Sequence, residues 1–564
     1  MPPPGRRIRL LLVLCGLGFA IVLGRAVQMQ IIDGDMYAER ASGQHRVEIV
    51  TRAPRGAILD RDGYRLALTE QARTIGATPS LVTDPAAVVA AVAEASGESP
   101  DVIMDRLTGG GEGIAHVDLA RQVPPAKAKR VQALGLKGLD FAVEERRVYP
   151  SAIAAPMIGV VDLDGAGLAG LELQYDEVLR GVDGIEVRTE DPAGNAISVL
   201  TQREMRRGAS LTTGIDREIQ RAAESITDAT RGEFRALAVT AIVLEPASGE
   251  VLAMASSPGP PNGDFRLAED ADAVRLRGIT DVYEPGSTFK AVTIGAGLAT
   301  GRIRPNTPVD VGWRWDLYDA TLRDSHPNPG RKTATDALRE SSNIGIAKLA
   351  YEHLSGPGGK DVVLAQWIDR FGFGEPTGID LPGEVGGIVT PYREWSGTTP
   401  LNIPIGHGIA TTPLQIAQLY ATIANDGVAI RPHVVTRIEG RGPVRAERER
   451  VMPARAARQL AQMLEGVVSD TGTGAAAEIP GYSVAGKTGT TKKLDEDGTY
   501  SKRRYLSWFV GFAPVENPRV VTLVMVDEPE GELFYGGDVA GPAFSKLTER
   551  ALIAMGVQRD RPDS

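Results

Sequence analysis

At 564 residues the chain is too long for a single compact core, so we expect two or more domains. Its 24% charged and 42% hydrophobic residues are usual proportions for a folded globular protein. The formal net charge of −10, from 62 basic and 72 acidic side chains, argues against a nucleic-acid-binding protein, which needs a concentrated basic surface.

An apolar segment close to the N-terminus predicts a membrane anchor. Apolar residues and glycine run without interruption from Leu10 to Gly24. A spanning helix needs about 20 residues, with about 17 as the lower end of the range. Residues 8–32 reach that length if the charged ends of Arg9 and Arg25 extend toward the membrane interfaces. We therefore expect a transmembrane helix over residues 8–32.

The flanking charges predict the orientation of this helix. Basic residues at positions 6, 7 and 9 precede the apolar run, so residues 1–7 should stay in the cytoplasm and the rest should be exported. A cleaved signal peptide is the alternative, but the small-residue cleavage pattern is missing after Gly24. A lipoprotein would use Cys15, but bulky Leu14 precedes that cysteine and the apolar run continues past it. No segment in 33–564 is apolar and long enough to be a second span.

Residues 45–210 have the pattern of an extended α+β module. Short strand-like runs, such as 46–51 and 185–188, stand between turn residues. Alanine-rich helical stretches, such as 84–95 and 124–134, separate them. We find no strong catalytic pattern in this region.

The pattern changes at residue 237, and we expect a second domain over 237–556. Two strand candidates, a mainly helical stretch, three further strand candidates and a last helix predict one sheet with a helical insertion beside it. The fold class is therefore α+β or α/β, with a five-stranded, mainly antiparallel sheet flanked by helices. The candidates are strands 237–244, 250–255, 482–491, 505–513 and 519–526, and helices 287–300, 333–353, 413–424 and 540–555.

The first motif with chemical meaning is Ser287 followed three residues later by Lys290. It comes directly after Glu284-Pro285-Gly286, a pattern typical of a helix start. Residues three apart share a helix face, so Lys290 can sit beside the Ser287 hydroxyl. A serine becomes a strong nucleophile only when a neighbouring base takes its proton, and a buried lysine can be that base. Taken alone, the pattern is also that of an ordinary amphipathic helix.

The second motif is Ser341-Ser342-Asn343, ahead of a helical stretch. Ser341 can relay a proton to a leaving amine, and Asn343 can donate to a substrate amide carbonyl. Serine and asparagine are also common helix caps, so this motif proves nothing alone.

The third motif is Lys487-Thr488-Gly489-Thr490, on the strand candidate 482–491. Gly489 has no side chain, so another backbone can approach the strand, and an extended peptide can add to such an edge. Lys487 and Thr490 could then hold a terminal carboxylate. A basic edge strand that prevents aggregation is the alternative interpretation.

Together the three motifs are far more specific than any one of them. Their order matches the serine, S-x-N and K-T-G triplet of the penicillin-recognising acyl transferases. The chain resembles a class B penicillin-binding protein, and within that family the division-specific FtsI type, over nearly its whole length. The other segments that carry this resemblance are 55–63, 147–150, 170–172, 279–287, 412–415 and 535–537.

The resemblance implies an N-terminal pedestal over 45–210, a transpeptidase domain over 237–556 and a reaction. Ser287 would attack the D-Ala–D-Ala carbonyl of a stem peptide with Lys290 as base, assisted by Ser341, Asn343 and Lys487. Thr488, Gly489 and Thr490 would bind the substrate, and the backbone N–H groups of Ser287 and Thr490 would form the oxyanion hole. Beta-lactams would acylate the same serine. His407 stands where relatives often carry another polar or aromatic residue, and we assign it no role.

The resemblance also implies location and partners. The protein would lie in the inner (cytoplasmic) membrane as a single-pass protein with a periplasmic catalytic domain. It would work with the membrane glycosyltransferase FtsW and other divisome proteins at the division septum. An elongation-specific transpeptidase and a D-Ala–D-Ala carboxypeptidase are the alternative functions. The six histidines are scattered without metal-ligand spacing, so we expect neither a metal nor a cofactor.

Overall fold

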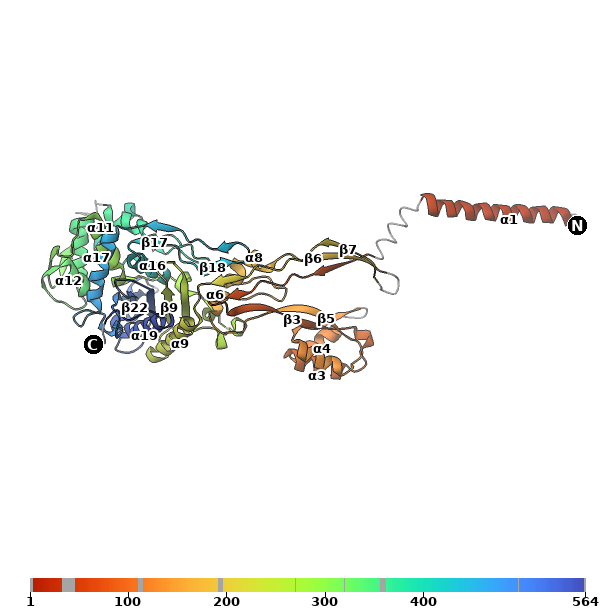
Figure 1. Cartoon of the computed structure of the whole chain (residues 1–564), viewed down its shortest axis with the longest axis horizontal. Coiled ribbons are helices and arrows are strands. Elements are labelled where there is room, and N and C mark those ends of the chain that lie inside the picture. Colours follow the sequence, from red (N-terminus) through yellow and green to blue (C-terminus); the bar gives the residue numbers. More distant parts are fainter. Residues whose placement is uncertain are drawn as a thin grey trace. The chain divides into compact units, whose positions relative to one another are not determined.

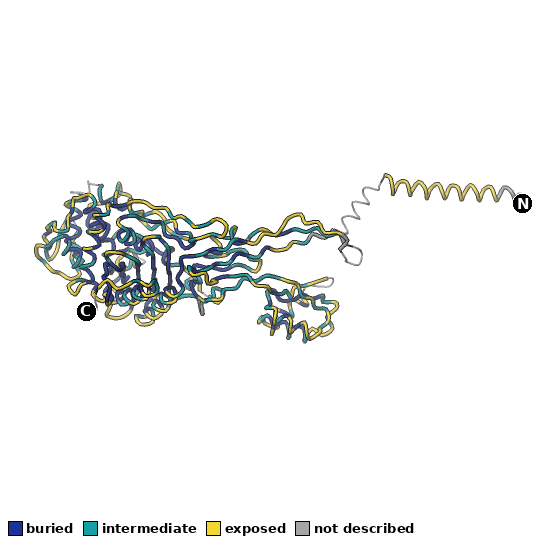
Figure 2. The backbone as a smooth tube through the Cα atoms, viewed as in Figure 1, coloured by how far each residue is buried: buried dark blue, intermediate teal, exposed yellow. Residues whose placement is uncertain are grey.

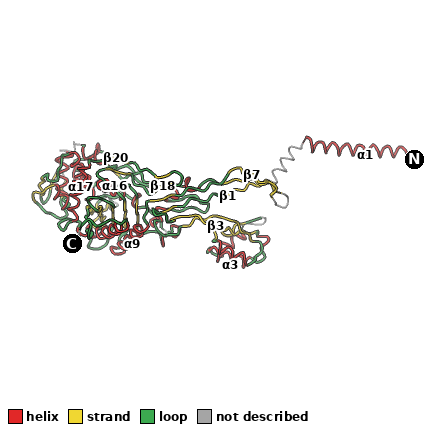
Figure 3. Tube along the Cα trace, in the orientation of Figure 1, coloured by secondary structure: helices red, strands yellow, loops and turns green. Residues whose placement is uncertain are grey.

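The computed structural model describes residues 4–32, 46–109, 115–190, 196–268, 270–318, 320–355, 362–495 and 497–561 (Figure 1). The chain forms two compact units, Met1–Arg55 with Arg180–Gly208 and Gly56–Leu179 with Ala209–Ser564. Residue 45, the expected start of the α+β module, lies outside the described residues. Figure 3 shows helices and strands mixed throughout the second unit, as the predicted fold class requires.

The first unit begins with a long apolar helix. Helix α1 spans Pro4–Val27 and continues as a π-helical turn over Gln28–Ile32. The segment Ile8–Ile31 has a mean hydropathy of 2.4, and none of it is buried against the rest of the chain (Figure 2). Its length and composition are those of a bilayer-spanning helix, which supports the predicted single-pass anchor.

A three-stranded antiparallel sheet completes this unit. Strand β6 (Gly184–Glu190) lies between β1 (Arg46–Thr51) and β7 (Ala196–Arg203). Beyond β7 the side chains of Arg206 and Arg207 are exposed to solvent.

The N-terminal part of the second unit is built on a long pair of antiparallel strands. Strand β3 (Arg65–Ala77) pairs with β5 (Leu139–Val148) over ten residue pairs, and β4 (Val117–Val123) pairs with the end of β3. Helix α3 (Pro85–Ser96) packs beside them, and Asp84 caps its first turn by accepting from Ala87 N. Other elements here include α4 (Pro100–Thr108), α5 (Pro125–Ala133), β2 (Ile58–Leu59) and β8 (Leu211–Thr213), and β18 (Val435–Ile438) pairs with β8 from later in the chain.

A buried ion pair connects three segments of this region that are far apart in sequence. Arg147 Nε donates to Glu172 at 2.7 Å, and these side chains are 3% and 0% exposed. Arg147 also donates to the carbonyl of Gly56 at 2.7 Å. Since a buried charge is costly without a partner, this contact fixes how the three segments pack.

The largest antiparallel sheet of the domain expected over 237–556 has five strands, all paired antiparallel. Its order is β10-β9-β23-β22-β21, so β21 is an edge strand. This confirms the predicted sheet and its two-then-three strand arrangement. The strands are β9 (Ala238–Leu244), β10 (Val251–Ser257), β21 (Ala485–Leu494), β22 (Tyr500–Ala513) and β23 (Val520–Asp527).

Helices cover both faces of this sheet because alternate side chains of each strand point to opposite sides. Val239 and Val243 of β9 belong to the core that includes α9 (Arg217–Phe234) and α19 (Gly541–Ala554). Ile242 and Leu244 belong to the core on the other face, which includes α11 (Lys290–Thr300), α16 (Pro413–Ala424) and α17 (Ala454–Glu465). Strands β9 and β23 are therefore buried on both faces, which explains their nearly continuous apolar runs.

The prediction of one continuous helix over 333–353 is wrong. The stretch 333–353 is divided into α12 (Ala334–Arg339) and α13 (Asn343–Ala350). Ser341 stands between them with φ of +56°, in the left-handed region, which ends the first helix. Ser342 then caps α13 by accepting from Gly345 N at 2.9 Å.

Candidate active site

Ser287 lies in a tight turn that leads into α11. The turn Gly286–Phe289 has 3₁₀ geometry, so the α-helix predicted from Ser287 begins only at Lys290. Gly286 has φ of +53°, and its N–H donates to the carbonyl of Gly406 at 3.1 Å. The Thr288 hydroxyl donates to the carbonyl of Pro285 at 2.8 Å. These contacts hold the turn from both sides.

Lys290 connects the first two motifs. Its side chain is fully buried, and Nζ donates to the Ser341 carbonyl at 2.7 Å, the Ser341 hydroxyl at 3.2 Å and Asn343 Oδ1 at 2.8 Å. The sequence predicts Lys290 beside the Ser287 hydroxyl, whereas in the structure its amine donates hydrogen bonds to the 341–343 loop. A buried ammonium needs acceptors, and the oxygens of that loop supply them. Burial lowers the pKa of Lys290 to about 7, although the negative charge of Asp324 opposes this shift.

The loop of Ser341 and Asn343 is itself held by Asp324. One carboxylate oxygen of Asp324 accepts from the Ser342 hydroxyl at 2.7 Å, and the other accepts from Ile344 N at 2.9 Å. The Asn343 amide donates to the carbonyl of Arg323 at 3.2 Å. Asp324 therefore accepts a hydrogen bond at the start of α13, and its negative charge also favours the protonated form of Lys290.

Lys487 brings the third motif to the same point. It lies on edge strand β21, fully buried, and its Nζ donates to the Ser341 hydroxyl at 2.9 Å and to the Thr488 carbonyl at 3.2 Å. Burial, with the nearby charge of Lys290, holds the pKa of Lys487 well below its usual value. The two lysines thus share one hydroxyl group.

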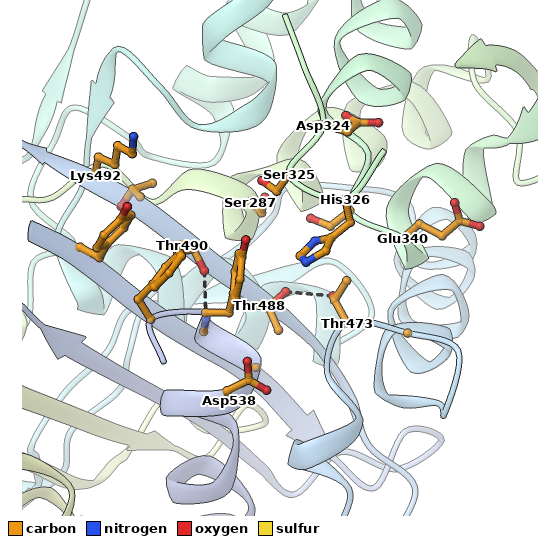
Figure 4. Close-up of a pocket in the computed structure, with 18 of the residues that line it drawn as sticks. Ser287, Asp324, Ser325, His326, Glu340, Thr473, Thr488, Thr490, Lys492 and Asp538 are labelled. Carbon is orange, nitrogen blue, oxygen red and sulfur yellow. Dashed lines mark hydrogen bonds between the residues drawn. The ribbon is translucent and has the colours of Figure 1, made fainter. Parts of the chain in front are cut away.

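The three residues after Lys487 follow the edge of the sheet. Figure 4 shows Thr488 bonded to Thr473, hydroxyl to hydroxyl at 2.9 Å, and Thr490 accepting from Gly536 N at 2.9 Å. Gly489 was expected to admit another backbone at the edge. In the structure a Cβ at Gly489 would lie 2.9 Å from Thr288 Cγ2, so the glycine makes room for the turn that carries Ser287.

Ser287, Ser341, Thr488 and Thr490 open onto one pocket of about 800 Å³, within the usual range for ligand sites. Sequence reasoning missed much of its lining, because these residues come from distant segments and match no local pattern. Aromatic rings form one wall, with Tyr505 stacked on Phe534 at 4.3 Å. The missed lining residues include Asp324, Ser325, His326, Thr473, Tyr500 and Tyr505. Among the described residues, no cluster of histidine, cysteine and acidic side chains could hold a metal ion.

Comparisons with known proteins identify the family. The penicillin binding protein transpeptidase domain matches residues 239–549, and the penicillin-binding protein dimerisation domain matches residues 50–213. The peptidoglycan D,D-transpeptidase FtsI of Escherichia coli K12 is 32% identical over 559 residues, covering 97% of this chain and 92% of the relative. The chain belongs to the class B penicillin-binding proteins. This confirms the predicted family and the predicted enzyme class, a serine-type peptidoglycan D,D-transpeptidase.

Two further proteins are similar at comparable levels of identity. Stage V sporulation protein D of Bacillus subtilis is 28% identical, with 98% of this chain and 86% of the relative covered. The crystal structure of penicillin binding protein 3 from Mycobacterium tuberculosis, complexed with aztreonam, superimposes with a TM-score of 0.70 at 28% identity. It covers 91% of this chain and 99% of that one.

The packing at Gly489 gives a testable expectation. We expect Gly489→Ala to lower the free energy of unfolding by about 1–3 kcal/mol, because the new methyl group collides with Thr288. Thr288→Ser removes the colliding methyl and keeps the hydroxyl, so the double variant should be more stable than the sum of the single effects. Urea unfolding measures both. Gly232→Ala, at a helix position with open space, is the control and should be neutral or stabilising. Wild-type stability of Gly489→Ala would contradict the packing argument.

Proposed function

We propose that Ser287 is the acylated nucleophile and that this transpeptidase cross-links peptidoglycan at the division septum. The convergence of Lys290 and Lys487 on the Ser341 hydroxyl, in the pocket that Ser287 lines, is the observation that supports the first part. A buried lysine that is neutral near pH 7 can take the proton of a serine hydroxyl.

The reaction proceeds in two acyl transfers. Ser287 Oγ attacks the carbonyl carbon between the two D-Ala residues of a stem peptide, and Lys290 takes its proton. The carbon–nitrogen bond breaks, and the terminal D-Ala leaves with a proton delivered through Ser341. An amine of a second stem peptide then attacks the ester, gives up a proton and restores the Ser287 hydroxyl. Beta-lactams acylate the same oxygen by opening their ring.

The edge strand binds the peptide in this proposal. The stem peptide lies along β21 as an additional strand, with its terminal carboxylate held by Lys487, Thr488 and Thr490. The backbone N–H groups of Ser287 and Thr490 stabilise the oxyanion, and Asn343 donates to a substrate amide carbonyl. Gly489 brings the strand close to the nucleophile turn.

The septal role and the surroundings are also proposals. The 32% identity to E. coli FtsI, together with the division-type segment 279–287, supports septal rather than elongation synthesis. The basic residues at positions 6, 7 and 9, ahead of the apolar run of α1, support an orientation with residues 1–7 in the cytoplasm and the catalytic domain in the periplasm. FtsW and other divisome proteins are the proposed membrane partners.

The nucleophile assignment predicts the result of penicillin labelling. Purified full-length protein should form a covalent adduct with a fluorescent penicillin, and Ser287→Ala should abolish it. Ser545→Ala, on α19 outside the pocket, should label as wild type does. Gel fluorescence after denaturation detects the adduct. Labelling that persists in Ser287→Ala would refute the assignment.

The lowered pKa of Lys290 predicts how acylation depends on pH. Since only the neutral amine accepts a proton, the acylation rate should fall about tenfold per pH unit below about pH 7 and level off above it. Asp324→Asn removes the negative charge that raises this pKa, so its midpoint should move to lower pH. Stopped-flow acylation between about pH 5.5 and 8.5 measures both. An acylation rate that does not change over this range would exclude Lys290 as the base.

The septal role predicts a cell shape. Depletion of the protein in its own cells should block division while growth continues, and the cells should become long filaments. Microscopy of a depletion strain, with the wild-type gene restored as the control, tests this. Round cells would instead indicate the elongation function.

A further inference from the structure

Glu284 stands three residues before Ser287 and takes no part in the proposed reaction. Its carboxylate is mostly buried, with 16% of the side chain exposed. It accepts hydrogen bonds from His407 Nδ1 at 3.0 Å, from Gly408 N at 2.8 Å and from the Tyr500 hydroxyl at 3.0 and 3.1 Å. Two segments that are more than a hundred residues away in sequence therefore meet at one side chain.

The first of these segments supports the nucleophile turn directly. The carbonyl of Gly406 accepts from Gly286 N at 3.1 Å. A Cβ at Gly406 would lie 2.2 Å from the Gly286 carbonyl oxygen, so the two backbones are in close contact. By binding His407 and Gly408, the Glu284 side chain fixes this segment at a second point.

The second segment belongs to the catalytic edge strand. Tyr500 is the first residue of β22 and pairs with Leu494 of β21, where the two strands join. The Thr491 hydroxyl of β21 donates to the Glu284 backbone carbonyl at 3.1 Å. Glu284 is thus bound to the β21–β22 hairpin through its main chain and its side chain.

The ionisation states of Glu284 and Tyr500 favour the hydrogen bond between them. Burial acts to raise the pKa of Glu284, but the hydrogen bonds from His407, Gly408 and Tyr500 outweigh it and hold the pKa below its usual value. Burial and the charge of Glu284 raise the pKa of the Tyr500 hydroxyl, so it remains a donor. His407 and Tyr500 line the pocket of Ser287, as does Lys492 of β21.

We propose that Glu284 is a positioning residue for acylation, whose carboxylate holds the turn of Ser287 and the β21–β22 hairpin in one fixed relation through His407 and Tyr500. This rests on the proposed role of Ser287. In that mechanism the nucleophile comes from the turn, whereas Thr490 of β21 supplies an oxyanion donor. A relative shift of about 1 Å between reacting groups can cost about 100-fold in rate. Glu284 itself touches neither the substrate nor the reacting atoms.

The test separates binding from chemistry. The full-length protein in detergent is mixed with a fluorescent penicillin at several concentrations, which yields a dissociation constant for the first complex and a rate constant for acylation. Glu284→Gln keeps the shape but removes the charge, so its acylation rate constant should fall about 10- to 100-fold while the dissociation constant stays within about twofold. Tyr500→Phe removes one donor and should lose about three- to tenfold.

Two further variants test the connection through His407. His407→Gln retains an N–H that can reach the carboxylate, whereas His407→Leu cannot donate. The glutamine variant should acylate several times faster than the leucine variant. Glu284→Gln combined with Tyr500→Phe should be about as slow as Glu284→Gln alone, because both changes interrupt one connection.

Several results would overturn the proposal. A wild-type acylation rate constant in Glu284→Gln is one, and a weaker first complex with unchanged acylation is another, since that would make Glu284 a binding contact. A third would be a double variant, Glu284→Gln with Tyr500→Phe, whose loss in acylation rate constant equals the product of the two single losses. If Glu284→Gln does not fold, as judged by thermal unfolding, the Tyr500 and His407 variants decide. Labelling of Ser287→Ala would refute the proposed function instead, so the two failures are distinguishable.

Discussion

The candidate active site is organised around two buried amines that share one hydroxyl group. Lys290 and Lys487 are both fully buried, and both donate to Ser341 Oγ, at 3.2 and 2.9 Å. Two neighbouring ammonium ions without water are strongly disfavoured. Burial lowers the pKa of Lys290, and burial together with the charge of Lys290 lowers the pKa of Lys487. An amine that is neutral near pH 7 is therefore a consequence of packing.

That packing requires the three motifs to approach very closely, and glycines allow it. A Cβ at Gly489 would contact Thr288 in the Gly286–Phe289 turn, and one at Gly536 would lie 2.3 Å from the Gly489 carbonyl oxygen. On the other side of the turn, Gly286 and Gly406 are in backbone contact. The turn of Ser287 is thus enclosed by a strand and a loop whose positions leave no room for side chains.

The sequence predicted local features well because their causes are local. The helix 413–424 was predicted at its observed bounds, because Thr412 and Gln415 form a capping box around Pro413. The edge position of β21 was expected from the Lys487-Thr488-Gly489-Thr490 motif, and the strand order of the sheet agrees with it. Ser341 could not be predicted in the left-handed region, because serine near a helix end usually indicates an ordinary cap.

The contacts of the site between residues far apart in the chain could not be predicted from the sequence. Asp324 reaches Ser342 across 18 residues, and Tyr500 reaches Glu284 across 216, with no periodic pattern that connects either pair. His407 was noted only as a departure from relatives, whereas the structure gives it a contact with Glu284. Such contacts depend on how the five-stranded sheet, the helical insertion and the β21–β22 hairpin pack around the pocket. The spacing of residues in a single sequence does not show that packing.

In the proposed mechanism, the shared hydroxyl also connects substrate binding to the base. The carboxylate of a stem peptide would place a negative charge beside Lys487 and favour its protonated form. A charged Lys487 would in turn disfavour charge on Lys290, while Asp324 limits how far the pKa of Lys290 falls. Ser341 lies between the two amines and can pass the proton from one to the other. Binding of the correct anionic peptide would therefore prepare Lys290 to accept the proton of Ser287.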